Sequence, residues 1–205
     1  MVNNNSIKKL DELFKQIDWQ DDEPVTDGIV DVEQYNKAKY KILWVLKEAN
    51  AKKGRWDLRE FIKNDLLRYN NWRRTYKLII YTTWGILNNF PEWKKQSRAW
   101  EEDKVKLLQQ IAIINLKKIP GKSRSSDKEI QEEFDKHKNI IFSQIDTFEP
   151  DIIIFGGTAK YLDDSDLNRI KKIKNCVVVS AYHPNARKSH KEYYEGVLAE
   201  IKKGS

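Results

Sequence analysis

The stretch DIIIFGG, residues 151–157, decides the fold class, because a continuous apolar run of strand length ends there in two glycines. Three other runs share this length and composition: YKILWVL at 40–46, IAIINL at 111–116 and VVVSAY at 177–182. Strands that are covered on both faces are apolar throughout, whereas half-exposed strands alternate apolar and polar residues. We therefore predict four strands of a mainly parallel sheet.

Segments with helical periodicity separate these runs. The clearest follows Ser126, which forms a capping-box pattern with Glu129. Residues 57–110 predict two or three helices, broken near Asn70 and Pro91, and residues 6–17 predict another. This alternation predicts the α/β class, as a three-layer α/β/α sandwich with a central, mainly parallel four-stranded sheet. We expect one domain over 1–205, with a helical extension at 1–39 and a core at 40–190.

Composition narrows the function classes. The formal charge is +7, with seven tryptophans and nine tyrosines, which favours a polyanionic partner such as DNA. Cys176 is the single cysteine, which predicts a reducing, cytoplasmic setting and excludes a disulfide or an iron–sulfur cluster within the chain. No apolar run reaches the ~20 residues that span a bilayer, and the three histidines lack metal-site spacing. We expect a monomer without membrane, metal or cofactor.

Polar residues and glycines follow the predicted strands at the point where each ends. Because the carboxyl ends of parallel strands meet at one edge of a sheet, we expect these residues to form a common site. In chain order they are Lys47, Glu48, Asn50, Asn115, Gly157, Thr158 and His183.

Each of these residues also has a structural interpretation. Glu48 suits a helix cap, Asn115 a loop, the Gly156–Gly157 pair a tight turn, and His183 a packed histidine. The coincidence of a carboxylate, an amide and an imidazole at one sheet edge favours the functional interpretation. The stretch IPGKS at 119–123 is no phosphate loop, because that motif requires a glycine where Leu116 stands.

Four segments together resemble the uracil-DNA glycosylase superfamily in order and spacing, over residues 40–190. They are VLKEAN at 45–50, IINLKKIPGKSRSS at 113–126, EPDIIIFGGTAKYL at 149–162 and VVVSAYHPNAR at 177–187. The first is most similar to the Gly-Glu-Ala-Pro-Gly form of the iron–sulfur branch, through Glu48 and Ala49. Lys47 stands where glycine is usual, Asn50 replaces proline, and the cluster cysteines are missing, as in a divergent, cluster-free member.

The resemblance implies a hydrolase that flips uracil or another deaminated base out of DNA and cleaves its N-glycosidic bond, as in base excision repair. His183 would stabilise the departing base anion and Glu48 would direct water at the sugar. The substrate-binding residues implied are Asn115, Asn50, Lys47 and Trp56, with Trp56 stacked on the extruded base. The DNA-binding residues implied are Gly157, Thr158, Ser123, Arg124, Asn185 and Arg187.

Lys47 leaves alternatives open, because a long cation could occlude the pocket, grip a phosphate or lower the pKa of Glu48. A second hypothesis is therefore a non-catalytic nucleic-acid-binding module of the same fold. A third is a hydrolase or binding protein for a small nucleoside or nucleotide. The basic aromatic stretch NNWRRTYKLIIYTTW, residues 70–84, could line a nucleic-acid groove through Arg73 and Arg74, or form a solvated helical face.

Overall fold

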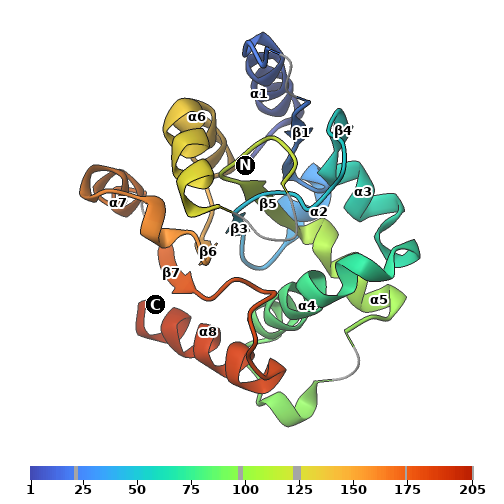
Figure 1. Cartoon of the computed structure of the whole chain (residues 1–205). Coiled ribbons are helices and arrows are strands. Elements are labelled where there is room, and N and C mark those ends of the chain that lie inside the picture. The colour runs from blue at the N-terminus through green and yellow to red at the C-terminus, as the bar shows by residue number, and fades with distance from the viewer. Residues whose placement is uncertain (21–22, 97–98, 122–125, 174, 205) are drawn as a thin grey trace.

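A five-stranded sheet forms the centre of the molecule (Figure 1), in a computed structural model that describes residues 1–20, 23–96, 99–121, 126–173 and 175–204. The strand order is β2-β5-β3-β6-β7. Four of these strands are parallel to one another: β3 (Ile42–Leu46), β5 (Ile111–Asn115), β6 (Ile152–Gly156) and β7 (Val177–Ala181). The four apolar runs are therefore strands of one sheet, as predicted.

The prediction of a plain four-stranded sheet is wrong in two respects. A fifth strand, β2 (Gly28–Ile29), pairs antiparallel with β5 and makes the sheet mixed. In addition, β1 (Val25–Thr26) and β4 (Trp56–Asp57) form a separate parallel pair. Strands of two residues are too short to carry a periodic pattern, so the sequence gives no signal for them. Residues 1–39 thus contribute a strand to the sheet and are more than a helical extension.

Helices cover both faces of the sheet, because successive strand residues point to opposite sides. Ile42, Trp44 and Leu46 of β3 share one apolar cluster with α3, α4, α5 and α8, whereas Leu43 and Val45 share the other with α1, α2, α6 and α7. The helices are α1 (Asn4–Gln16), α2 (Val32–Lys37), α3 (Leu58–Asn64), α4 (Arg73–Leu87), α5 (Glu102–Val105), α6 (Asp127–Phe148), α7 (Asp164–Lys171) and α8 (His190–Gly204). Since α8 contacts β7 and α4, the core extends past residue 190.

Short 3₁₀ turns join the longer elements. They are η1 (Leu66–Arg68), η2 (Asn70–Trp72), η3 (Trp93–Lys95), η4 (Lys106–Gln110) and η5 (Ala159–Tyr161). The break predicted near Asn70 lies between η1 and η2, and α4 ends before Pro91, as predicted. Ser126 caps α6 by accepting a hydrogen bond from the Glu129 N–H at 3.4 Å. Among the described helices, none is long and apolar enough to cross a membrane.

Candidate functional site

A cavity of about 120 Å³ lies at the carboxyl ends of β3, β5 and β7. Glu48 and Asn50 line it from the loop after β3, Asn115 from the end of β5, and His183 from the loop after β7. We call it the strand-end cavity. The three groups expected to act together, a carboxylate, an amide and an imidazole, therefore border one common space.

His183 is held in one tautomer by its own loop. Its Nδ1 accepts a hydrogen bond from the Asn185 N–H at 3.0 Å, so in the neutral ring the proton is on Nε2. Burial, with a smaller contribution from the charge of Lys47, lowers the pKa of His183 to about 4. Near neutral pH the imidazole is therefore uncharged and has an N–H to donate.

Two glycines allow the His183 loop to approach the end of β6. A side chain at Gly156 would meet Leu46 at 2.8 Å and Pro184 at 3.1 Å, and one at Gly157 would meet His183 at 3.1 Å. Gly157 also has φ +75°, which favours glycine. The Gly156–Gly157 pair thus has a structural purpose, because it places the histidine at the cavity.

The carboxylate of Glu48 is buried between segments that follow β3 and β5. These segments run side by side, since the Gly121 N–H donates to the Ala49 carbonyl at 2.9 Å. A Cβ at Gly121 would lie 1.7 Å from the Glu48 carboxyl carbon. The Glu48 Oε2 lies 3.1 Å from Lys117 Nζ, an ion pair without the angles of a hydrogen bond, and neither oxygen has a hydrogen-bond partner among the described residues.

Lys117 is a site residue that the sequence reasoning missed. Its side chain is 8% exposed and lies between Glu48 and Glu129, whose Oε2 is 3.3 Å away. Burial acts to lower the pKa of Lys117, but the ion pair with Glu48 and the hydrogen bond to Glu129 outweigh burial and raise that pKa. Two adjacent lysines follow Asn115 in the sequence, but nothing there distinguishes Lys117, which pairs with Glu48, from Lys118, which pairs with Asp27.

Asn115 is oriented by a buried carboxylate. Asp27 Oδ2 accepts a hydrogen bond from the Asn115 N–H at 2.7 Å and lies 3.5 Å from its side-chain Nδ2. Asp27 Oδ1 accepts from Lys118 Nζ at 2.7 Å and from Gln144 Nε2 at 2.9 Å. Because a carboxylate accepts only, the amide nitrogen of Asn115 faces Asp27 and its Oδ1 points the other way.

The aromatic residue at the cavity differs from the one expected. Trp56 does not line the strand-end cavity; its ring packs against Phe61 and Trp72, at centroid distances of 5.7 and 6.0 Å. Trp72 and Tyr76, from η2 and the first turn of α4, line the cavity instead. They belong to the basic aromatic stretch 70–84, in which Arg73 and Arg74 are exposed.

Lys47 does not pair with Glu48. Its Nζ lies 3.2 Å from Asp127 Oδ1, at the start of α6, and 5.8 Å from the centre of the Tyr161 ring. Hydrogen bonds from Lys160, Tyr161 and Lys47 hold the pKa of Asp127 well below its usual range. The cation of Lys47 is thus drawn to Asp127, although Lys47 still lines the strand-end cavity.

The residues expected to bind DNA fall into three groups. In the first group, the Gly157 N–H donates to the Ala181 carbonyl at 2.7 Å, and the buried Thr158 hydroxyl donates to the Val45 carbonyl at 2.7 Å. Both donors therefore already hold the strand ends together. Asn185 lines the cavity and Arg187 is exposed on the same loop. The remaining two, Ser123 and Arg124, lie outside the described residues.

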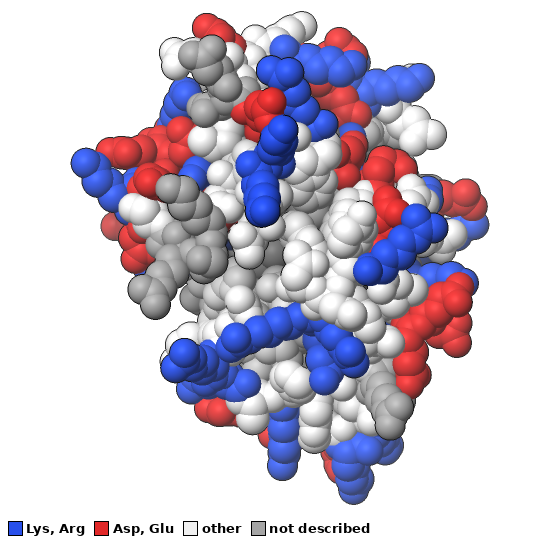
Figure 2. Space-filling model, turned by 45° about the vertical axis from the view of Figure 1, so that its right-hand side comes forward, with Lys and Arg blue, Asp and Glu red and all other residues white. Residues whose placement is uncertain are grey.

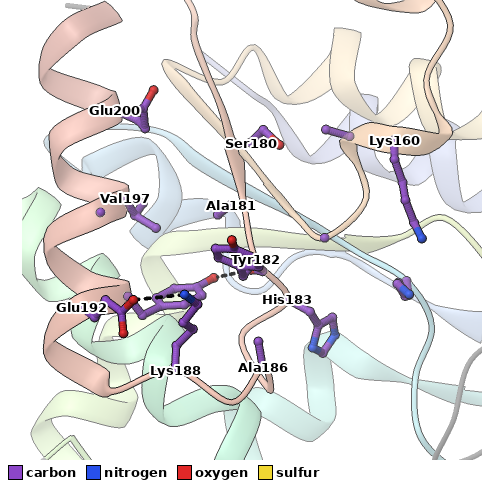
Figure 3. A pocket seen from close by; sticks show the side chains of 15 residues that line it. Lys160, Ser180, Ala181, Tyr182, His183, Ala186, Lys188, Glu192, Val197 and Glu200 are labelled. Atoms are coloured by element: carbon purple, nitrogen blue, oxygen red, sulfur yellow. Dashed lines mark hydrogen bonds and ion pairs between the residues drawn. The ribbon is translucent and has the colours of Figure 1, made fainter.

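A larger groove of about 830 Å³ lies on the other side of His183, between β7 and α8. We call it the β7 groove. Figure 3 shows Tyr182 and Lys188 between the end of β7 and α8, where Lys188 Nζ is 3.0 Å from Glu192 Oε1. Tyr182 is 64% exposed. His183 therefore borders two hollows, a small polar one and a wide one.

Basic side chains gather on one face of the molecule (Figure 2). Figure 2 shows lysines and arginines across the middle of one face, around an uncharged, hollowed area. This distribution suits a polyanion, in line with the net charge of +7. Within the described residues no group of three or more His, Cys, Asp or Glu side chains is arranged to hold a metal ion.

Comparison of the chain with models of known protein families finds no match. Comparison with curated proteins finds none either. The resemblance to the uracil-DNA glycosylase superfamily therefore stays a prediction, based on the four sequence segments.

Proposed function

We propose that this protein binds an extruded nucleic-acid base in the strand-end cavity and hydrolyses its N-glycosidic bond. The observation that carries the proposal is that Glu48, Asn115 and His183, from three different strand ends, line one cavity with Trp72. At about 120 Å³ the cavity is smaller than the ~300–1,000 Å³ of typical small-molecule sites, which suits a single ring better than a whole nucleoside.

His183 supports the proposal through its protonation state. When the C–N bond breaks, its electrons move onto the base, and negative charge gathers on a carbonyl oxygen of the ring. A neutral imidazole that borders the cavity and carries its proton on Nε2 can donate to that oxygen. Donors of this type contribute about 10²–10³ in kcat elsewhere, because they strengthen as the charge develops.

Glu48 supplies the group for the other half of the reaction. A water oxygen must bond to the sugar carbon that the base leaves, and its proton must go to a base, for which Glu48 is the nearby carboxylate. Its oxygens are buried with incomplete hydrogen bonding, and such costly arrangements gather at functional sites. The departing base anion then takes a proton from solvent.

Asn115 and His183 support a choice of ligand. The amide Oδ1 of Asn115, turned away from Asp27, accepts a hydrogen bond, while His183 donates one. Together they complement a ring with adjacent C=O and N–H groups, as in uracil, hypoxanthine or xanthine. A ring with an unprotonated nitrogen at that position, such as cytosine, would place two acceptors against each other.

A second candidate function is base binding without cleavage. One observation favours it: the Glu48 carboxylate packs on Gly121 and pairs with Lys117, so it must turn before it can activate water. In that case the protein recognises the base and leaves the glycosidic bond intact.

Single- and double-stranded oligonucleotides that contain uracil, hypoxanthine or xanthine provide the test. After incubation with the protein, alkali reveals abasic sites as strand breaks. We expect cleavage of at least one substrate, with about a 10²–10³-fold loss for His183→Ala and a comparable loss for Glu48→Gln. His190→Ala is the matched control, because this histidine also has a lowered pKa but contacts Tyr81 outside the cavity.

Absence of cleavage on every substrate, together with tight binding to the base-containing strands, would replace the hydrolase with the binding module. Absence of both would reject the proposal and leave the small-nucleoside hypothesis. Equal losses for His183→Ala and His190→Ala would show that the histidine acts through folding alone.

A further inference from the structure

A second hollow, of about 980 Å³, opens beside the strand-end cavity. Four aromatic residues line one side of it, and we call it the aromatic groove. They are Trp56 from β4, Phe61 from α3, Tyr69 between the turns η1 and η2, and Trp72 from η2. The loop after β3 and residues 119–121 line the other side.

The four rings form a connected, partly exposed cluster. The Phe61 ring lies 5.0 Å from Trp72 and 5.6 Å from Tyr69, and Trp56 reaches both Phe61 and Trp72. Tyr69 is 50% exposed. Aromatic side chains of this size usually lie in the core, so a cluster of them along an open groove indicates a binding surface.

The aromatic groove adjoins the strand-end cavity. Asn50, Asn71 and Trp72 line both hollows. A chain-like ligand with one ring in the cavity would therefore pass Trp72 and continue along the groove. This adjacency places the groove where the next units of the same ligand would lie.

Charge on the rim of the groove favours an anionic ligand. Lys52 and Lys53 lie on the loop after β3, and neither ammonium has an ion-pair partner within 4.0 Å among the described residues. Glu23, an acidic residue of the lining, lies 3.5 Å from Arg55, so its charge is compensated. Within the part of the chain that the structure describes, the rim thus presents two cations without an ion-pair partner, beside aromatic faces.

We propose that the aromatic groove binds single-stranded nucleic acid next to the base held in the cavity. Bases stack on the exposed rings, and Lys52 and Lys53 contact the phosphates. Stacking on aromatic side chains tolerates any base, because every base has a π-face, but it requires unpaired bases. This inference rests on the proposed function for the base in the cavity, and it adds that the substrate is single-stranded.

The test measures binding of the full chain to a fluorescent 15-nucleotide thymidine oligonucleotide and to the matching duplex. Tyr69→Ala should weaken binding of the single strand by about 5- to 150-fold, the usual effect of losing one stacking ring. Leu67→Ala is the matched control, since Leu67 is 41% exposed two residues away and does not line the groove.

The lysines have a separate readout. In Lys52→Gln and Lys53→Gln, the slope of log K against log salt concentration should fall by about 0.7 for each lysine, the value for one phosphate contact on a single strand. Lys8→Gln, on the exposed side of α1, should leave the slope unchanged.

Duplex binding as tight as single-strand binding would overturn the inference, as would equal affinities for Tyr69→Ala and Leu67→Ala. A larger loss in Tyr182→Ala would assign the strand to the β7 groove instead. A proline-rich peptide that binds where the oligonucleotide does not would make the groove a protein-docking site. These measurements record binding and not cleavage, so they test the groove whether or not the glycosidic bond is hydrolysed.

Discussion

At the scale of single residues, the tautomer of His183 and the packing of Glu48 decide what the strand-end cavity can do. The Asn185 N–H occupies Nδ1 of the imidazole, which leaves Nε2–H to donate. Burial removes the charge of the ring, because an imidazolium loses more hydration than a neutral ring does. A histidine in this state is a hydrogen-bond donor at neutral pH and acts as an acid only at much lower pH.

The lowered pKa of His183 predicts a specific pH dependence of stability. Between its usual value of about 6.5 and its folded value of about 4, the unfolded chain binds a proton at this site that the folded chain does not. The free energy of unfolding should therefore fall as pH drops through this window, by on the order of 3 kcal/mol from this group. Urea denaturation at several pH values gives the free energy of unfolding against pH. In this window that plot should be flatter for His183→Gln than for the unmodified protein. Identical slopes for both proteins would contradict the folded pKa.

Gly121 provides a test of where the Glu48 carboxylate lies. A methyl group at this position would overlap the carboxylate, so Gly121→Ala should destabilise the protein by about 1–3 kcal/mol through overpacking. In a Glu48→Ala background, Gly121→Ala should reduce the free energy of unfolding much less. The difference between the two losses measures the overlap of the methyl group with the carboxylate.

The matched control for Gly121 is Gly196→Ala. No atom lies within 4 Å of the added methyl group there, and alanine favours the α8 helix, so this variant should be neutral or up to about 1 kcal/mol more stable. Equal costs of Gly121→Ala in both backgrounds would place the carboxylate elsewhere.

At the scale of elements, the segments that follow the strands are fastened to one another. Thr158, at the end of β6, donates its hydroxyl to the carbonyl of Val45 in β3, and the Gly157 N–H donates to Ala181 in β7. Three adjacent strand ends are thus linked, which fixes the spacing between Glu48 and His183. Rigid strand ends of this kind preorganise a site better than free loops do.

Thr158→Val tests this structural role against phosphate binding. The side chain keeps its shape but loses the hydroxyl, so the Val45 carbonyl loses a partner in a fully buried position. We expect a loss of about 1–3 kcal/mol in unfolding free energy, measured by urea denaturation. The salt dependence of oligonucleotide binding should stay the same. A reduced salt slope with unchanged stability would instead make Thr158 a phosphate ligand, as the family resemblance implies.

At the scale of the whole molecule, a buried polar network ties three distant segments together. Asp27 precedes β2, Lys118 follows β5, and Gln144 lies in α6; the Asp27 and Lys118 side chains are fully buried. Burial lowers the pKa of Lys118, although attraction to Asp27 opposes this effect. Because the same carboxylate holds Asn115, the network links the stability of the fold to the orientation of a cavity residue.

Removal of one partner from this network should strongly destabilise the fold. Asp27→Ala leaves the ammonium of Lys118 buried without its counter-charge, which costs about 3–5 kcal/mol in comparable pairs. The double variant Asp27→Leu with Lys118→Met should be more stable than Asp27→Ala, since it buries no charge. Thermal unfolding of the three proteins gives the comparison. A double variant that is less stable than Asp27→Ala would show that the charges stabilise the fold in themselves.

The parts of the fold that the sequence predicted are those with a local signal. Each of the runs at 40–46, 111–116, 151–157 and 177–182 contains a strand, and Ser126 begins a long helix, because apolar run length and helix capping depend on neighbouring residues. β2 gave no such signal. It is a strand only because Gly28 and Ile29 pair with Ile113 and Ala112, far along the chain.

By itself the sequence determined that the polar residues after the strands would meet at one edge of a parallel sheet, since the direction of the strands sets that position. The tertiary structure alone decided which side chains border the cavity: Trp72 instead of Trp56, and Lys117 instead of Lys47 as the partner of Glu48. Side-chain direction depends on packing between segments that are distant in sequence, so it cannot be predicted from composition and spacing.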